Sequence, residues 1–158
     1  MIPTGLNLAF AGAVLLPLTL VAWIDVKERR IPNTLNLAIW TLGMMRIAVT
    51  EPALLLVALR DTGIVAGLFF GMAWFLPRIR HSARIGAGDL KFLVATAPWV
   101  AWQGSIVVLF GAALLACLLV IVERPRLQAG LQRERPFGPM LAASFTLILG
   151  YALIASRT

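Results

Sequence analysis

The chain alternates between long apolar runs and short polar connections, and the runs have lengths expected of helices that cross a bilayer. Turn and helix-end signals bound the runs, for example Pro32 before the second and Pro136 before the last. The longest polar connection runs only from Glu123 to Pro136, so no soluble domain fits between the runs. We therefore predict an all-α polytopic membrane protein in which residues 1–158 form a single transmembrane domain. The six predicted transmembrane helices span residues 5–24, 34–50, 58–76, 89–103, 105–122 and 137–155.

Composition supports a lipid environment. Of the 158 residues, 60% are hydrophobic and 13% are charged, whereas a soluble domain carries about 25% charged residues. The first apolar run has no basic region before it and no clear small-residue cleavage site after it, so we expect a retained span and not a signal peptide. The single cysteine, Cys117, excludes a disulfide framework and a cysteine-based zinc site. We expect no metal and no cofactor.

The positions of the basic residues predict the orientation. Eleven of the 14 Lys and Arg residues lie in, or directly beside, the connections that follow the first, third and fifth spans. Because Lys and Arg collect on the cytoplasmic side, these connections should be cytoplasmic and both termini outside, in a bacterial inner membrane. The net charge of +7 then reflects membrane orientation, and no nucleic-acid partner is expected. The eleven residues are Lys27, Arg29, Arg30, Arg78, Arg80, Arg84, Lys91, Arg124, Arg126, Arg133 and Arg135.

Two acidic residues directly abut the cytoplasmic ends of predicted spans. Asp25 closes the first span and Asp89 opens the fourth, so the topology puts them on one face at similar depth. Residues 89–122 provide about 51 Å of helix, whereas two full crossings need about 60 Å. Asp89 should therefore be drawn below the membrane surface, where a carboxylate needs a wet cavity or a partner. Asp61 lies on the outer side, with Arg60 as its neutralising neighbour.

Two carboxylates at one depth can share a proton and activate water, because the ionised one accepts a proton and the neutral one polarises a carbonyl. Asp25 sits at the negative end of its predicted helix, and Asp89 sits at the positive end of its own, where the anion is favoured. We hypothesise that Asp89 is the base and Asp25 the protonated partner. Each also has a plainer interpretation, since Asp89 suits a helix N-cap and Asp25 suits a surface acid balanced by Lys27 and Arg29. The flanking Gly86 and Gly88 permit a close approach that a side chain would forbid.

The motifs around both aspartates resemble those of the type IV prepilin peptidases, which are aspartic proteases of the GxGD type. The matching stretches are Asp25-x-Lys27-x-x-x-Ile31-Pro32-Asn33, Gly86-Ala87-Gly88-Asp89-Leu90-Lys91 and the turn Pro136-Phe137-Gly138-Pro139. The resemblance covers nearly the whole chain. It implies a membrane endopeptidase with Asp25 and Asp89 as catalytic residues, which cleaves the basic leader of prepilins at the cytoplasmic face.

The resemblance is strongest to compact members of that family. Larger bifunctional members carry a cytoplasmic loop with paired Cys-x-x-Cys motifs and N-methylate the new terminus, and this sequence lacks that loop. N-methyltransferase activity is therefore doubtful. The compact form resembles the minimal enzymes that serve Flp (tight-adherence) pili, or a trimmed type IV pilin system.

The sequence does not indicate which residues bind the substrate. Lys91 either orients Asp89, contacts substrate or only flanks the membrane. Glu28, Glu123 and Glu134 are the spare acids that are available to receive a basic leader, and His81 is expected to be a solvated loop residue.

Other functions remain open. One alternative is another GxGD protease, such as an archaeal preflagellin peptidase or a signal-peptide-peptidase-like enzyme. A small transporter or channel could use Asp25 and Asp89 as a proton or cation relay. Such a protein should place ionisable groups near mid-span or on both sides, so two cytoplasmic carboxylates favour the peptidase. A structural membrane subunit would leave the glycine-flanked Asp89 unexplained.

Overall fold

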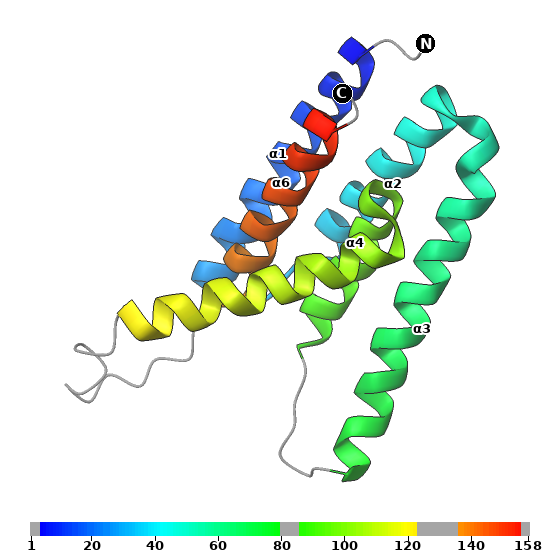
Figure 1. The fold of residues 1–158 in the computed structure, drawn as a ribbon. Coiled ribbons are helices and arrows are strands. Elements are labelled where there is room, and N and C mark those ends of the chain that lie inside the picture. Colours follow the sequence, from blue (N-terminus) through cyan, green and yellow to red (C-terminus); the bar gives the residue numbers. More distant parts are fainter. Residues whose placement is uncertain (1–3, 80–85, 123–135, 156–158) are drawn as a thin grey trace.

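The computed structural model describes residues 4–79, 86–122 and 136–155, and over these residues it contains helices and short connections but no strand (Figure 1). The predicted all-α fold class is thereby confirmed. Proline precedes α2 and begins η1, in keeping with its preset φ and missing N–H. The elements are α1 (Thr4–Glu28), α2 (Asn33–Thr50), the 3-10 turn η1 (Pro52–Leu54), α3 (Leu55–Ile79), α4 (Ala87–Val122) and α6 (Gly138–Ala155).

Among the residues that the structure describes, four helices are long enough and apolar enough to cross a membrane. The predicted six crossings are therefore not confirmed. One reason is that α2 carries Asn33, Asn36 and Arg46 within 18 residues, which lowers its hydropathy. The other is that two predicted spans fall within the single element α4. The four candidates are Gly5–Glu28, Pro52–Phe75, Ala87–Val122 and Gly138–Ala155.

Helix α4 consists of two arms that run in different directions, as Figure 1 shows. The break lies at Ala101, whose φ of 58° and ψ of 179° are not helical. The first arm covers residues 87–100 and the second covers 102–122. Pro98 lies one turn before the break, in keeping with the proline's missing donor. The sequence predicted a boundary in this region but placed it at Gly104, three residues too late.

The first arm of α4 forms the centre of the bundle, because α4 packs against α2, α3 and α6 while α1 packs against α2 and α6. Phe92 on this arm is fully buried and meets Phe145 of α6 edge-on, with ring centroids 6.3 Å apart. Trp99 also meets Phe145 edge-on, and its Nε1 donates a hydrogen bond of 2.9 Å to the Ile39 carbonyl of α2. These contacts hold the first arm in place, and Asp89 lies in the first turn of this arm.

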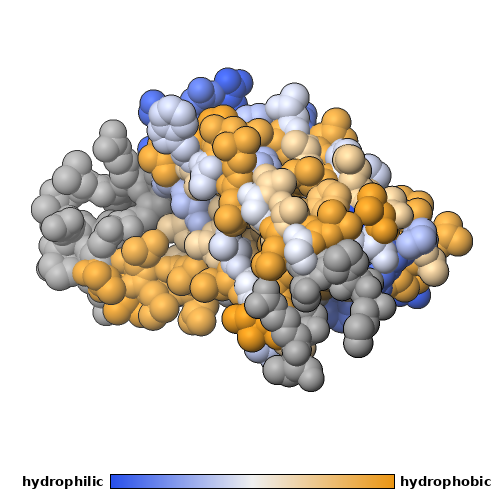
Figure 2. Space-filling model, turned by 90° about the horizontal axis from the view of Figure 1, so that it is seen from above, coloured by the Kyte–Doolittle hydropathy of each residue, from blue (hydrophilic) through white to orange (hydrophobic). Residues whose placement is uncertain are grey.

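Much of the outer surface is apolar. Figure 2 shows hydrophobic side chains spread across the face seen from above, and Leu56, Phe110 and Val122 are each at least 69% exposed. Such a surface suits contact with lipid, as the sequence predicted. The predicted neutralisation of Asp61 is also confirmed, because its buried Oδ1 lies 3.0 Å from Arg60 Nη2.

Candidate active site

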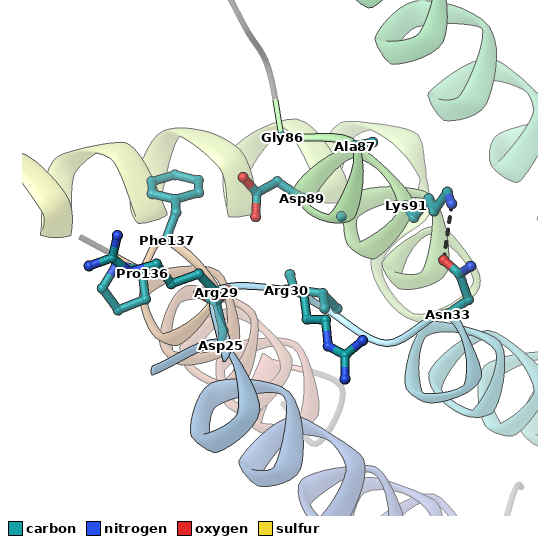
Figure 3. A pocket seen from close by; sticks show the side chains of 12 residues that line it. Asp25, Arg29, Arg30, Asn33, Gly86, Ala87, Asp89, Lys91, Pro136 and Phe137 are labelled. Atoms are coloured by element: carbon teal, nitrogen blue, oxygen red, sulfur yellow. Dashed lines mark hydrogen bonds between the residues drawn. The ribbon is translucent and has the colours of Figure 1, made fainter. Parts of the chain in front are cut away.

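A cavity of about 380 Å³ gathers the three motifs that the sequence singled out (Figure 3). The end of α1 and the following turn supply one wall, the start of α4 another, and the turn before α6 the third. All five residues predicted for the site, namely Asp25, Gly86, Gly88, Asp89 and Lys91, line this cavity. Their convergence on one cavity is compatible with a dyad, and their catalytic role stays a prediction.

Asp25 lies within the last turn of α1, which continues to Glu28 and so beyond the predicted end of the first span. Its side chain is buried, and Oδ2 accepts a hydrogen bond of 2.7 Å from the backbone N–H of Gly138. A Cβ at Gly138 would lie 2.8 Å from that oxygen, so only glycine permits this contact. The end of α1 is formed by Arg29, whose φ of 52° is left-handed and whose N–H donates to the Asp25 carbonyl.

The Gly138 contact changes the electrostatics that the sequence suggested for Asp25. Gly138 begins α6, so the carboxylate of Asp25 faces the positive end of that helix as well as the negative end of its own. Because Oδ2 accepts a hydrogen bond from Gly138, this contact favours Oδ1 as the site of a proton on this carboxyl group. The assignment of Asp89 as the base stays a prediction.

Asp89 is the third residue of α4 and not its N-cap, since the helix begins at Ala87. Its carboxylate points across the cavity towards Phe137 in Figure 3. A Cβ at Gly86 would lie 2.6 Å from Asp89 Oδ2, so glycine allows the carboxylate to fold back over the start of the helix. No hydrogen bond to this carboxylate occurs within the part of the chain that the structure describes, which leaves it available to water.

Gly88 connects the two aspartate motifs. A Cβ at this position would lie 3.3 Å from Ile31 Cβ and 3.5 Å from the Ile31 backbone nitrogen. Glycine thus lets the start of α4 pack closely on the turn that follows α1. The predicted need for close approach is confirmed here, and the approaching group is Ile31.

Lys91 extends away from Asp89 and donates a hydrogen bond of 3.0 Å to Asn33 Oδ1 (Figure 3). This geometry does not support a role of Lys91 in orienting Asp89. The hydrogen bond instead ties the start of α4 to the start of α2, so both helices meet at the edge of the cavity.

Of the three acidic residues predicted to be available to a basic leader, the structure describes only Glu28. Glu28 is engaged by Arg30, with Oε2 and Nη2 only 2.6 Å apart. Glu123, Glu134 and His81 lie outside the described residues. Across the described ranges no cluster of three or more His, Cys, Asp or Glu side chains is arranged to hold a metal ion.

Sequence reasoning missed several residues at or beside the cavity, above all Gly138, which contacts Asp25. The turn Pro136-Phe137-Gly138-Pro139 had been recognised, and Pro136 and Phe137 indeed line the cavity. What no local pattern indicated was that its glycine would meet Asp25, 113 residues earlier in the chain. Arg29 and Arg30, which had been read as topology signals, also line the cavity.

Asp25 and Asp89 line the same cavity, as a pair of catalytic carboxylates would have to do. Their charges are close enough to repel one another, a situation in which two carboxyl groups hold one proton between them. The cavity has room for water, which occupies about 30 Å³ per molecule, and for part of a peptide.

Comparisons with known proteins agree with this chemistry. A model of the type IV leader peptidase family matches residues 12–121, a region that includes Asp25 and Asp89. Leader peptidase HopD of Escherichia coli is 32% identical over 143 residues, which cover 90% of this chain and 92% of that protein. No solved structure matches the chain significantly.

Longer relatives match as well. The prepilin leader peptidase/N-methyltransferase of Burkholderia pseudomallei is 31% identical over 152 residues, which cover 94% of this chain and 48% of that protein. The corresponding protein of Escherichia coli K12 is 31% identical over 132 residues, 81% of this chain and 56% of that protein. The chain thus spans about half the length of these two relatives. Since the family model and HopD both cover most of the chain, it belongs to the type IV leader peptidase family and is a peptidase.

Proposed function

We propose that this peptidase is a membrane-embedded aspartic endopeptidase that removes the basic leader from prepilin-like substrates at the cytoplasmic face of the bacterial inner membrane. The observation that carries the proposal is the convergence of Asp25 and Asp89 on one cavity. The substrate class follows from relatives that are named leader peptidase and prepilin leader peptidase.

The dyad would act through one water molecule. The ionised carboxylate takes a proton from water as the water oxygen attacks the scissile carbonyl carbon, and the protonated carboxyl gives its proton to the carbonyl oxygen. In the resulting gem-diol, the base passes the proton that it took from water to the leaving nitrogen. The former acid, now a carboxylate, recovers a proton from a diol hydroxyl, and the C–N bond breaks. Asp89 would be the base, and Asp25, held at Oδ2 by Gly138, would carry its proton on Oδ1.

The cytoplasmic location of the site is supported by the cations around it. Arg29, Arg30 and Lys91 line the cavity, and the positive-inside tendency places such residues in the cytoplasm. In this proposal α2 and both arms of α4 each cross the membrane, which gives six crossings with both termini outside. The first arm provides only about 21 Å of helix, so its start would lie below the surface.

The alternatives receive less support. A proton or cation relay needs ionisable groups along the membrane, but Asp61, the other buried aspartate, is paired with Arg60. A structural subunit would not need glycine at the contacts with both carboxylates. Another GxGD protease, such as a preflagellin peptidase, would use the same dyad and differ only in substrate.

Co-expression with a type IV prepilin tests the proposal. We expect the wild-type chain to convert the prepilin to its shorter form, whereas Asp25→Ala and Asp89→Ala accumulate at normal levels and leave it unprocessed. Glu51→Ala removes an exposed acid outside the cavity and should process normally. Continued processing by either aspartate variant would refute the dyad.

A further inference from the structure

A groove of about 250 Å³ lies between α2 and the first arm of α4 and adjoins the dyad cavity. Asn33 and Lys91, which are joined by a hydrogen bond, line both spaces and mark the boundary between them. Beyond this pair the groove follows both helices, and its lining is apolar except for Asn36. The apolar residues are Leu37, Trp40, Val94 and Ala95.

Asn36 is the unusual residue of this groove. Its side chain is 5% exposed, and neither Oδ1 nor Nδ2 has a hydrogen-bond partner. Within the described ranges, no other side chain leaves both a buried donor and a buried acceptor unpaired. A buried amide without partners is destabilising, and native proteins seldom leave one without a reason.

We propose that this groove receives the part of the substrate that follows the scissile bond, where its apolar segment begins, and that the Asn36 amide hydrogen-bonds the peptide backbone there. The inference rests on the proposed function and adds a binding site to it. A peptide unit offers one N–H and one C=O, which match the acceptor and the donors of an asparagine amide. Because both amide atoms of Asn36 are buried in this structure, contact with an occupant requires a rotation about the side-chain torsions.

The geometry limits which part of the substrate Asn36 can reach. Asn36 lies three residues beyond Asn33, or about 5 Å along the helix axis. An extended peptide advances about 3.3 Å per residue, so Asn36 meets the substrate about one or two residues beyond the point where the substrate passes Asn33. The apolar lining suits aliphatic or aromatic side chains and would exclude the charges of a basic leader.

Two other apolar grooves are less suitable for this role. One lies between α1 and α2 and is lined by Leu16 and Leu35. The other lies between the second arm of α4 and α6, beside Leu114 and Ser144. Neither shares a lining residue with the dyad cavity, and no unpaired buried amide occurs among their lining residues.

Cross-linking tests which groove the substrate occupies. A background with Cys117→Ser, Asp25→Asn and Asp89→Asn has no cysteine and should bind substrate without cleaving it. Single cysteines are then introduced as Leu37→Cys in the proposed groove and as Leu16→Cys and Leu114→Cys in the other two. The three leucines are similarly exposed, at 62%, 69% and 62%. The probe is a type IV prepilin with one cysteine at successive positions after its cleavage site.

We expect a disulfide-linked product with Leu37→Cys and none with the two control positions. A cysteine-free chain with an intact dyad is assayed for prepilin cleavage in parallel. Suppose that the cysteine-free chain cleaves the prepilin, but the disulfide-linked product forms equally at the control positions or at no position. The groove assignment is then overturned, and the proposed peptidase function is retained. If the cysteine-free chain does not cleave the prepilin, the proposed function is overturned and the groove assignment with it.

Kinetics test the role of the Asn36 amide. Asn36→Leu should lower kcat/KM by about tenfold, mainly through KM, because a contact with bound substrate is lost. Its Tm should equal or exceed that of wild type, because an unpaired buried amide is removed. Asn7→Leu, at another buried and unpaired amide oxygen, is the matched control and should keep kcat/KM. A lower Tm with unchanged KM for Asn36→Leu would show a purely structural residue and contradict the proposal.

Discussion

At the scale of single residues, the proposed dyad depends on glycine wherever a carboxylate meets backbone. A Cβ at Gly138 would lie 2.8 Å from Asp25 Oδ2, and one at Gly86 would lie 2.6 Å from Asp89 Oδ2. The consequences of adding a methyl group differ. The Asp89 carboxylate is free to rotate, whereas Asp25 is buried and is approached by Gly138 at Cβ and Cγ as well. Asp25 therefore has to move as a whole.

Gly138→Ala should reduce the rate of prepilin cleavage by about 10²-fold, because a small displacement of a catalytic group has an effect of this size. Gly150→Ala lies in the same helix with nothing within 4 Å of its Cβ. This control should keep the wild-type rate and gain up to about 1 kcal/mol of stability. Cleavage rate and Tm are measured for both variants. Full activity of Gly138→Ala would mean that the contact does not position Asp25.

The residues of the site were predictable to different degrees. Asp89, Gly86 and Gly88 stand side by side in the sequence, so their association needed no knowledge of the fold. The placement of Asp25 on the same face as Asp89 followed from counting cations along the chain, whereas their shared cavity is seen only in the structure. Its contact with Gly138 is tertiary, and the hydrogen bond of Lys91 to Asn33 joins residues that are 58 positions apart. Neither contact leaves a local signal.

At the scale of elements, α2 holds the end of the first arm of α4 and thereby fixes the arm that carries Asp89 in its first turn. Arg46 Nη2 donates a hydrogen bond of 3.3 Å to the Pro98 carbonyl, next to the break. Trp99 packs against Gly43, where a Cβ would lie 2.7 Å from Nε1. Thr96 and Ser105 join the two arms by a hydrogen bond of 3.1 Å between their hydroxyl groups.

The position of the break could not be read from the sequence. Gly104 and Ser105 are the stronger turn signals in this stretch, so the boundary was expected there. The left-handed φ falls instead on Ala101, a residue with no preference for it. Tertiary contacts of the arms with α2 and α6 decide the position, and these contacts are not local.

Ala101→Gly should therefore stabilise the protein by about 1 kcal/mol, because glycine adopts this conformation without the strain that alanine incurs. Ala97→Gly is the control, since Ala97 is buried in the same arm with helical geometry. It should destabilise by about 1 kcal/mol. Thermal unfolding of both variants in detergent gives the comparison. A lower Tm for Ala101→Gly would show that the break is not strained.

At the scale of the whole molecule, the feature to explain is how many times the chain crosses the membrane. The apolar exterior and the four candidate spans agree with the membrane location that composition predicted. The number of crossings was less predictable, because α2 is polar for its length and lies at the limit of what a bilayer accepts. Whether residues 1–158 form one domain stays a prediction.

Cysteine labelling distinguishes six crossings from four. In a Cys117→Ser background, Glu28→Cys marks the end of α1, Leu54→Cys marks η1, and Gln103→Cys follows the break in α4. A membrane-impermeant maleimide should label Leu54→Cys and Gln103→Cys from outside the cell, and Glu28→Cys only in inside-out vesicles. Labelling of Leu54→Cys and Glu28→Cys from the same side would show that α2 does not cross.

The most direct measurement is the initial rate at which the purified chain, in proteoliposomes, cleaves a type IV prepilin. Asp25→Asn and Asp89→Asn should each lower this rate by about 10²–10⁴-fold, because each removes one partner of the acid–base pair. Asp61→Asn, an identical change outside the cavity, should have little effect, and so should EDTA, because no metal is expected to take part. The account would be contradicted if either dyad variant cleaved as fast as Asp61→Asn, or if EDTA abolished cleavage.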